Sequence, residues 1–162
     1  MFSASVPLYA GQVALALGAR RVRLVDSRPS VRRAATRLGI EPLRPKELRR
    51  VRPAPLVVAA SATAKGMWAA LSRTAPDGVC SSVGGLHRVG RVPVVRGFAR
   101  NVSFYLGRTH ARALMPEVLE LIAQGRFRPE RVISTLGDWE EAPRLLGRHY
   151  RGSDVKTVLH RS

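Results

Sequence analysis

The chain has 162 residues, of which 45% are hydrophobic, and its 28 Lys and Arg outnumber its 11 Asp and Glu, for a formal charge of +17. This length and hydrophobic content fit a globular protein with a packed core and exclude a disordered chain. A single cysteine, Cys80, excludes an internal disulfide framework and any metal site built from a cysteine cluster.

The first predicted element is an amphipathic helix, because apolar residues recur at helical spacing over 6–17, with Ser5 as N-cap and Gly18 as the stop. A short apolar strand follows over 22–25 and ends at Asp26. An acid after the second strand of a dinucleotide-binding βαβ unit accepts hydrogen bonds from the adenosine ribose, about 20 residues beyond a glycine-rich fingerprint. The spacing therefore indicates a ribose-binding role for Asp26, and the alternative is a solvated carboxylate at an ordinary strand end.

The glycine fingerprint itself is not present. Phe2, Ala4 and Pro7 stand at the spacing where the glycines of G-x-G-x-x-G would fall. We therefore expect the chain to start inside the βαβ unit, with its first strand and glycine loop missing. That strand is central in the order 3-2-1-4-5-6, so its loss would leave two neighbouring strands unpaired.

Helices and strands continue to alternate through the first two thirds of the chain. The pattern predicts a helix over 29–38, a connector helix in the Arg- and Pro-rich segment 42–55, a strand over 56–60 covered on both faces, a helix over 63–71, a turn at 75–78 and a strand over 79–83. This alternation is typical of an α/β fold, a Rossmann-like doubly wound and mostly parallel sheet.

The remaining segment has a different character. We expect an extended segment over 89–95, a strand over 102–106, a helix over 114–123 with Pro116 in its first turn, a strand over 132–136, a helix to Leu146 capped by Asp138 and Glu141, and a last strand over 157–159. We divide the chain into an incomplete dinucleotide-binding domain, 1–100, and the closing elements of the fold, 101–162.

The order of these elements resembles the C-terminal half of the medium-chain dehydrogenase/reductase superfamily, the zinc-type alcohol dehydrogenases and their relatives. The resemblance covers nearly the whole chain and is carried by the segments 8–19, 22–26, 71–84, 118–125, 140–143 and 156–159. It implies hydride transfer between a nicotinamide and an alcohol, aldehyde or ketone. It also implies that this chain is a fragment of such an oxidoreductase and is inactive alone.

The same resemblance implies cofactor-binding roles for five residues. Asp26 would hold the adenosine ribose, and Arg28 would contact the adenine edge or a 2′-phosphate. Val83 and Gly84 would line the nicotinamide side of the cleft, and Lys156 would lie near the pyrophosphate. Because the carboxylate of Asp26 repels a 2′-phosphate, NAD is favoured over NADP.

No catalytic or metal-binding residue is assigned. The zinc ligands of the family lie in an N-terminal GroES-like domain, and nothing in this chain corresponds to that domain. The four histidines show no metal-ligand spacing, and Cys80 is predicted to be a small buried strand residue. The histidines are His87, His110, His149 and His160.

Two other functions stay open. The first is a noncatalytic remnant or assembly partner, either a homo-oligomer joined through the sheet edge near 92–106 or a chain complemented by a GroES-like protein. The second is a basic nucleic-acid-binding domain, which the charge of +17 favours. The basic residues are dispersed and no RNP-like aromatic pair or zinc finger accompanies them, so we expect only nonspecific binding through charge.

The sequence also predicts a cytoplasmic protein that does not enter a membrane. No run of about 18 apolar residues is present, so no membrane-spanning helix is expected. The N-terminus shows no basic region followed by an apolar core, so no secretory signal is expected.

Overall fold

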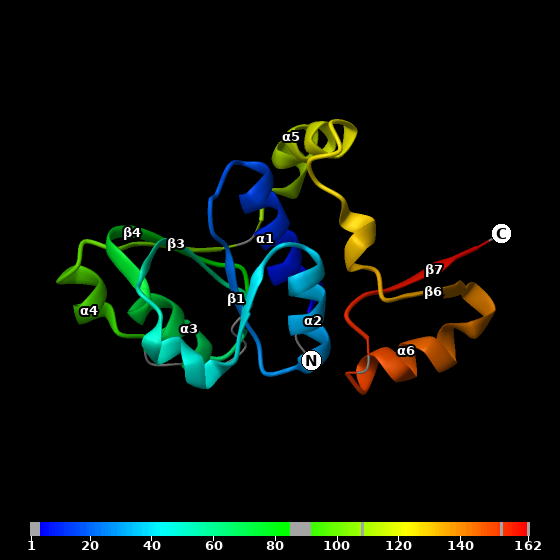
Figure 1. Ribbon diagram of the computed structural model, residues 1–162, viewed down its shortest axis with the longest axis horizontal. Coiled ribbons are helices and arrows are strands. Elements are labelled where there is room, and N and C mark those ends of the chain that lie inside the picture. Colours follow the sequence, from blue (N-terminus) through cyan, green and yellow to red (C-terminus); the bar gives the residue numbers. More distant parts are fainter. Residues whose placement is uncertain (1–3, 85–91, 108, 153, 162) are drawn as a thin grey trace. The chain divides into compact units, whose positions relative to one another are not determined.

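The computed structural model describes residues 4–84, 92–107, 109–152 and 154–161 (Figure 1). These residues form two compact units, one made of the chain up to Arg49 and from Arg112 onward, the other of Arg50–Ala111. Every strand pair in both units is parallel. The parallel pairing confirms the predicted α/β, Rossmann-like fold, whereas the domain boundary near residue 100 stays a prediction.

The first unit holds two parallel strand pairs, β1 with β2 and β6 with β7. Its elements are α1 (Ser5–Ala16), β1 (Arg23–Val25), α2 (Pro29–Arg37), β2 (Glu41–Leu43), α5 (Ala111–Ala123), η2 (Pro129–Val132), β6 (Thr135–Asp138), η3 (Trp139–Glu141), α6 (Ala142–Tyr150) and β7 (Thr157–His160). The predicted connector helix after β2 is the short 3-10 helix η1 (Pro45–Arg50).

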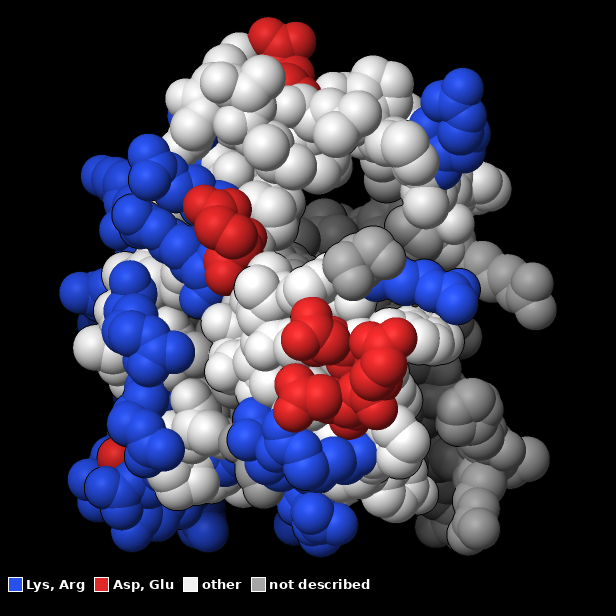
Figure 2. Space-filling model, turned by 90° about the vertical axis from the view of Figure 1, so that its right-hand side faces the viewer, with Lys and Arg blue, Asp and Glu red and all other residues white. Residues whose placement is uncertain are grey.

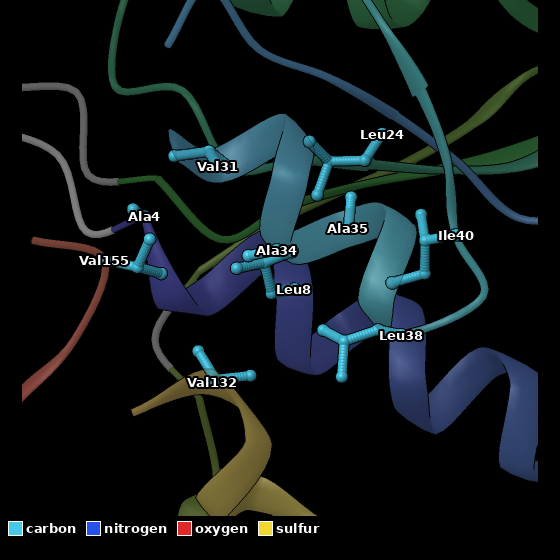
Figure 3. Close-up of a cluster of buried hydrophobic side chains, with 10 residues drawn as sticks. All are labelled: Ala4, Leu8, Leu24, Val31, Ala34, Ala35, Leu38, Ile40, Val132 and Val155. Atoms are coloured by element: carbon cyan, nitrogen blue, oxygen red, sulfur yellow. The ribbon is translucent and has the colours of Figure 1, made fainter. Parts of the chain in front are cut away.

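The core of the first unit is built where α1 and α2 pack beside β1 (Figure 3). Leu8 of α1 is fully buried, and Val31 and Ala35 of α2 lie in the same cluster. A Cβ on Gly11 would lie only 2.5 Å from Cδ1 of Ile40. Because glycine has no side chain, α1 can pack closely against Ile40 at this position. Val132 and Val155 also join this core, which ties the late elements of the chain to the early ones.

The expected start of α1 is wrong by one residue. Ser5 is the first helical residue and is buried, and Ala4 stands at the N-cap position without a side-chain hydrogen bond. Ala4 already has helical dihedrals, φ −71° and ψ −23°, so no extended residue is available to direct a serine hydroxyl at the first turn. The predicted stop is confirmed, since Gly18 follows the helix with φ +94°.

The second unit is a three-stranded sheet in the order β3-β4-β5 with two helices. Its elements are β3 (Ala54–Ala59), α3 (Ala64–Ser72), β4 (Thr74–Ser82), α4 (Val94–Phe98) and β5 (Ser103–Leu106). Met67 and Leu71 of α3 pack on Ala59 and Cys80. The completely buried Cys80 confirms the prediction of a small core residue, and burial raises the pKa of its thiol, although a hydrogen bond involving Thr74 acts in the opposite direction.

Three expectations for the second unit are wrong. Leu56 and Val58 of β3 are exposed, because the strand packs on α3 and pairs only with β4, so it is not covered on both faces. The segment 75–78 is part of β4, where the register shifts and Asp77 has φ +57°. The segment 94–98 is helical, and residues 89–91 of that prediction lie outside the described residues.

Three further expectations are not fully met in the first unit. Pro116 lies inside α5, because the helix begins at Ala111. Residues 129–132 form η2, and the strand starts only at Thr135. The capping box is only half formed: Glu141, which pairs with Arg144, also accepts a hydrogen bond from the Asp138 backbone, but the Asp138 side chain pairs with His160 and makes no cap bond.

Among the described strands, only β4 has two neighbours. β1 pairs with β2, and β3 pairs with β4. No described strand precedes α1.

Candidate functional site

The predicted ribose-binding acid lies at the carboxyl end of β1. The backbone N–H of Asp26 donates to Leu43 O at 3.1 Å, which extends the pairing with β2 by one residue. The side chain of Asp26 is only 12% exposed, and Arg28 holds it on both oxygens. Nε of Arg28 donates to Oδ1 at 3.0 Å, Nη2 donates to Oδ2 at 2.7 Å, and the backbone N–H of Arg28 donates to Oδ1 at 2.8 Å.

The turn between β1 and α2 is shaped by these bonds. The bond from the Arg28 backbone to Oδ1 is an Asx-type turn, which residues of this kind favour between a strand and a helix. From α2, Nη1 of Arg32 donates to the carbonyl oxygens of Asp26 and Ser27 at 2.9 and 2.7 Å. The side-chain hydrogen bond to Asp26 raises the pKa of the Arg28 guanidinium, burial opposes this, and charge attraction adds to it.

This geometry defines what Asp26 can still accept. A carboxylate has about four acceptor positions. Three of them take the donors of Arg28, so one position on Oδ2 is left for a hydroxyl group. The pair carries no net charge, and its repulsion of a phosphate is therefore weaker than that of an isolated carboxylate.

Gly84 and Val83 follow the carboxyl end of β4. Their backbone N–H groups donate to Ala59 O at 3.3 and 3.1 Å, which closes the chain onto the end of β3. A Cβ on Gly84 would lie 2.8 Å from both the carbonyl carbon and the oxygen of Ser61. Glycine is therefore required here by backbone packing, while the Val83 side chain is exposed.

Two hydroxyl residues at the same strand ends escaped the sequence reasoning. Oγ of Ser61 and Oγ1 of Thr63 lie 2.8 Å apart, and Thr63 caps α3 by accepting from the Gly66 N–H at 3.1 Å. The signal was present as a threonine directly before the helix, the usual N-cap residue type. Ligands of open parallel sheets bind at the carboxyl ends of strands, where these hydroxyls lie with Gly84.

The five predicted residues are therefore distributed over separate places. Asp26 and Arg28 are in direct contact, whereas Val83 and Gly84 belong to the other unit. Lys156 directly precedes β7, and its backbone oxygen accepts from Ser134 and Thr135. The Lys156 side chain makes no hydrogen bond or ion pair with the other described residues.

Of the described histidines, two contact other side chains and one is exposed on the surface. His149 contacts Thr157 Oγ1 at 3.1 Å, His160 pairs with Asp138, and His110 is exposed. His87 lies outside the described residues. Within the described part of the chain, no three His, Cys, Asp or Glu side chains gather as a metal site would require. In that same part, no helix has the length and apolar character to cross a bilayer.

Comparison with known proteins gives structural matches alone. No protein-family model matches the sequence, and no curated protein does. An alcohol dehydrogenase from Thermus sp. ATN1 superposes with a TM-score of 0.90 at 29% identity, over 98% of this chain and 50% of that chain.

The chain resembles the zinc-type alcohol dehydrogenases. Two other structures carry a nicotinamide cofactor. An alcohol dehydrogenase from Escherichia coli CFT073 complexed with NADH has a TM-score of 0.81 at 14% identity, over 93% of this chain and 47% of its own. A protein described as a zinc-binding dehydrogenase, from Sinorhizobium meliloti 1021 and bound to NADP, has a TM-score of 0.77 at 17% identity. The match covers 92% of this chain and 47% of that protein.

These matches confirm the resemblance to the medium-chain dehydrogenase/reductase superfamily that the order of elements predicts. The chain spans about half the length of the alcohol dehydrogenases it matches. The Thermus protein is the most informative of the three because its identity of 29% extends over nearly all of this chain.

Proposed function

We propose that this chain provides nicotinamide dinucleotide binding for an alcohol dehydrogenase-like oxidoreductase. The observation that carries the proposal is the superposition on the Thermus alcohol dehydrogenase over 98% of the chain. The acid at the carboxyl end of β1 supports it from the chain's own residues. The reaction of the assembled enzyme would be hydride transfer between the nicotinamide and an alcohol, aldehyde or ketone.

The residues at the end of β1 fit the ribose end of the cofactor. Asp26 is nearly buried, fixed in place, and retains one acceptor position for a ribose hydroxyl. Arg28, whose guanidinium is bound to Asp26, would meet the adenine edge or, in NADP, a 2′-phosphate. Val83 and Gly84 would contact the nicotinamide side, and Lys156 would lie near the pyrophosphate.

The Asp26–Arg28 pair also bears on the choice of cofactor. A free carboxylate favours NAD, but a neutralised one discriminates less against the additional phosphate of NADP. We propose that NAD is still preferred, since the remaining acceptor position on Oδ2 serves a hydroxyl and not a phosphate.

The direct test is to measure cofactor binding by titration calorimetry. We expect the chain to bind NAD, and Asp26→Ala to weaken binding about tenfold, as the loss of a hydrogen bond to a charged group implies. Glu117→Ala, which removes an exposed carboxylate from α5, is the matched control. Equal affinity of the parent chain and the Asp26 variant would remove Asp26 from the site.

We also propose that the 162-residue chain does not turn over alcohols by itself. The support is its coverage of about half of the matched dehydrogenases and the lack of a metal-ligand cluster among the residues described. Hydride transfer needs a group that polarises the substrate oxygen next to the cofactor. Turnover by the purified chain with any alcohol would contradict this proposal and leave the one on cofactor binding intact.

A second candidate is an assembly role. Five large apolar side chains are exposed in the segment predicted to join copies of the chain: Val94, Val95, Phe98, Tyr105 and Leu106. An exposed apolar patch of this kind is typical of a protein interface. We expect Phe98→Glu to reduce the mass measured by analytical ultracentrifugation if copies associate here, whereas a parent chain that is monomeric at all concentrations contradicts the role.

A further inference from the structure

A cavity that is open to solvent lies in the first unit, away from the carboxyl end of β1, and the three arginines that line it are exposed. It has a volume of about 140 Å³ and is lined by Gln12 and Leu15 of α1, by Leu38 after α2, and by the guanidinium-bearing residues that follow α5, Arg126, Arg128 and Arg131. Its lining therefore carries three positive charges, and no acidic side chain is among the lining residues.

A buried amide contributes a further polar group to this cavity. Gln12 is only 8% exposed, and its Nε2 is buried with no hydrogen-bond partner among the described residues. An unsatisfied buried donor is costly, so such groups usually have a protein, water or ligand partner. A ligand oxygen in the cavity would supply that partner once the Gln12 side chain turns its amide toward the cavity.

The arginines keep donors available for a ligand. Arg126 donates to the carbonyl oxygen of Ala16 at the end of α1 and to Oε1 of Gln124. Arg128 donates from Nε to Gly125 O at 3.3 Å. These contacts fix the two side chains but use only part of the five donors that each guanidinium carries. Arg131 has no side-chain hydrogen bond or ion pair with the residues that the structure describes.

We propose that this cavity binds a phosphoryl group. The planar guanidinium group of arginine carries N–H donors whose geometry matches the oxygens of phosphate, and it forms strong charge-assisted hydrogen bonds with them. The volume exceeds the roughly 30 Å³ of one liquid water several times over. It is also well below the roughly 300–1,000 Å³ of ordinary small-molecule sites, so it admits one phosphoryl group and not a whole dinucleotide. This site is separate from the ribose-binding acid and does not depend on the proposed oxidoreductase function.

The test uses inorganic phosphate as the probe, titrated into the full chain at constant ionic strength with chloride as the replaced anion. We expect saturable binding, and we expect Arg128→Ala and Arg131→Ala each to weaken it by about tenfold or more. Arg131→Lys should restore part of the affinity, because lysine keeps the charge but not the fork. Arg112→Ala, an exposed arginine on α5 outside the cavity, should leave the affinity within about twofold.

Gln12→Met separates a binding role from a structural one. Because it removes an unsatisfied buried amide, the variant should unfold at the same or a higher temperature without phosphate, yet bind phosphate several-fold more weakly. A phosphomonoester such as glycerol phosphate, used in the same titration, distinguishes an esterified ligand from free phosphate by which of the two binds more tightly. The proposal is overturned if phosphate binds no better than chloride, or if Arg112→Ala weakens binding as much as Arg131→Ala does.

Discussion

At the scale of single residues, the neighbours of a side chain decide what a motif can do. Asp26 was predicted as an acceptor from its place at a strand end, about 20 residues beyond the positions of the glycine fingerprint. The structure adds a nearly buried position and an ion pair with Arg28. The sequence spacing does not predict that ion pair, because an arginine two residues after an acid can extend into solvent as easily as it can bind the acid. The pair leaves Asp26 with fewer acceptor positions than a free carboxylate has.

Gly84 gives the first prediction at this scale. Gly84→Ala should lower the free energy of unfolding by about 1–3 kcal/mol, because the new Cβ would meet the backbone of Ser61, which cannot move aside as a side chain does. Chemical denaturation measures the change. The control is Gly97→Ala in α4, where a Cβ meets nothing within 4 Å and should be tolerated. Equal destabilisation by both variants would contradict the packing argument.

Asp154 gives a prediction about pH. Burial by itself raises its pKa, but hydrogen bonds from Arg148 and Thr135 outweigh burial, so the pKa of the carboxyl is lowered in the folded state. A lowered pKa contributes stability above the unfolded-state pKa, and this contribution is lost as the pH falls through the folded value. We expect Asp154→Asn to be less stable than the parent near neutral pH.

The difference in stability between the parent chain and Asp154→Asn should become smaller as the pH falls. Thermal unfolding of both proteins between about pH 7 and about pH 3 measures this difference. Glu117→Gln on the exposed face of α5 is the control and should show no such convergence. A stability difference for Asp154→Asn that is constant with pH would show that the carboxylate charge does not stabilise the fold.

At the scale of elements, packing decides which face of a helix is buried. The apolar repeat predicted for the first helix consists of Val6, Tyr9, Ala10, Val13, Ala16 and Leu17. The structure instead buries Leu8, which is not in that repeat, whereas Val6 is 39% exposed and Leu17 is 69% exposed, so the predicted face is wrong. The buried face is set by the elements that pack on α1 and not by hydrophobic periodicity alone. Val132 and Val155, distant in the chain, complete the cover over α1.

We therefore expect Leu8→Ala to lower the free energy of unfolding by about 2–5 kcal/mol, as a cavity in a filled core does. Leu17→Ala, the same chemical change at the exposed end, should cost less than about 0.5 kcal/mol. Urea unfolding of both variants provides the comparison. Similar losses would show that the end of α1 is covered in solution.

At the scale of the whole molecule, charge dominates the surface. The net charge of +17 is spread along the chain, and Figure 2 shows Lys and Arg side chains over much of one face, with Asp and Glu gathered in a few places. A dispersed positive charge attracts any polyanion but provides no arrangement that reads a base sequence.

The chain should accordingly bind DNA weakly at low salt, and its affinity should fall steeply between about 50 and 200 mM salt. Fluorescence anisotropy with two duplexes of unrelated sequence measures both the salt dependence and the discrimination. We expect the same affinity for both duplexes. Discrimination that persists at the higher salt concentration would favour the nucleic-acid-binding alternative.

The sequence alone predicted the class of fold, most of the helices and strands, and the place of Asp26 at a strand end, but not the strand β2 or the helix α4. The predicted features follow from hydrophobic periodicity and from glycine and proline at element ends, which are local properties. Tertiary structure decided what depends on partners distant in the chain. It exposed Leu56 and Val58 of β3, paired the Asp138 side chain with His160 in place of a cap, and required glycine at position 84. It also placed Gln12 in the lining of one pocket with arginines more than 100 residues away in the chain.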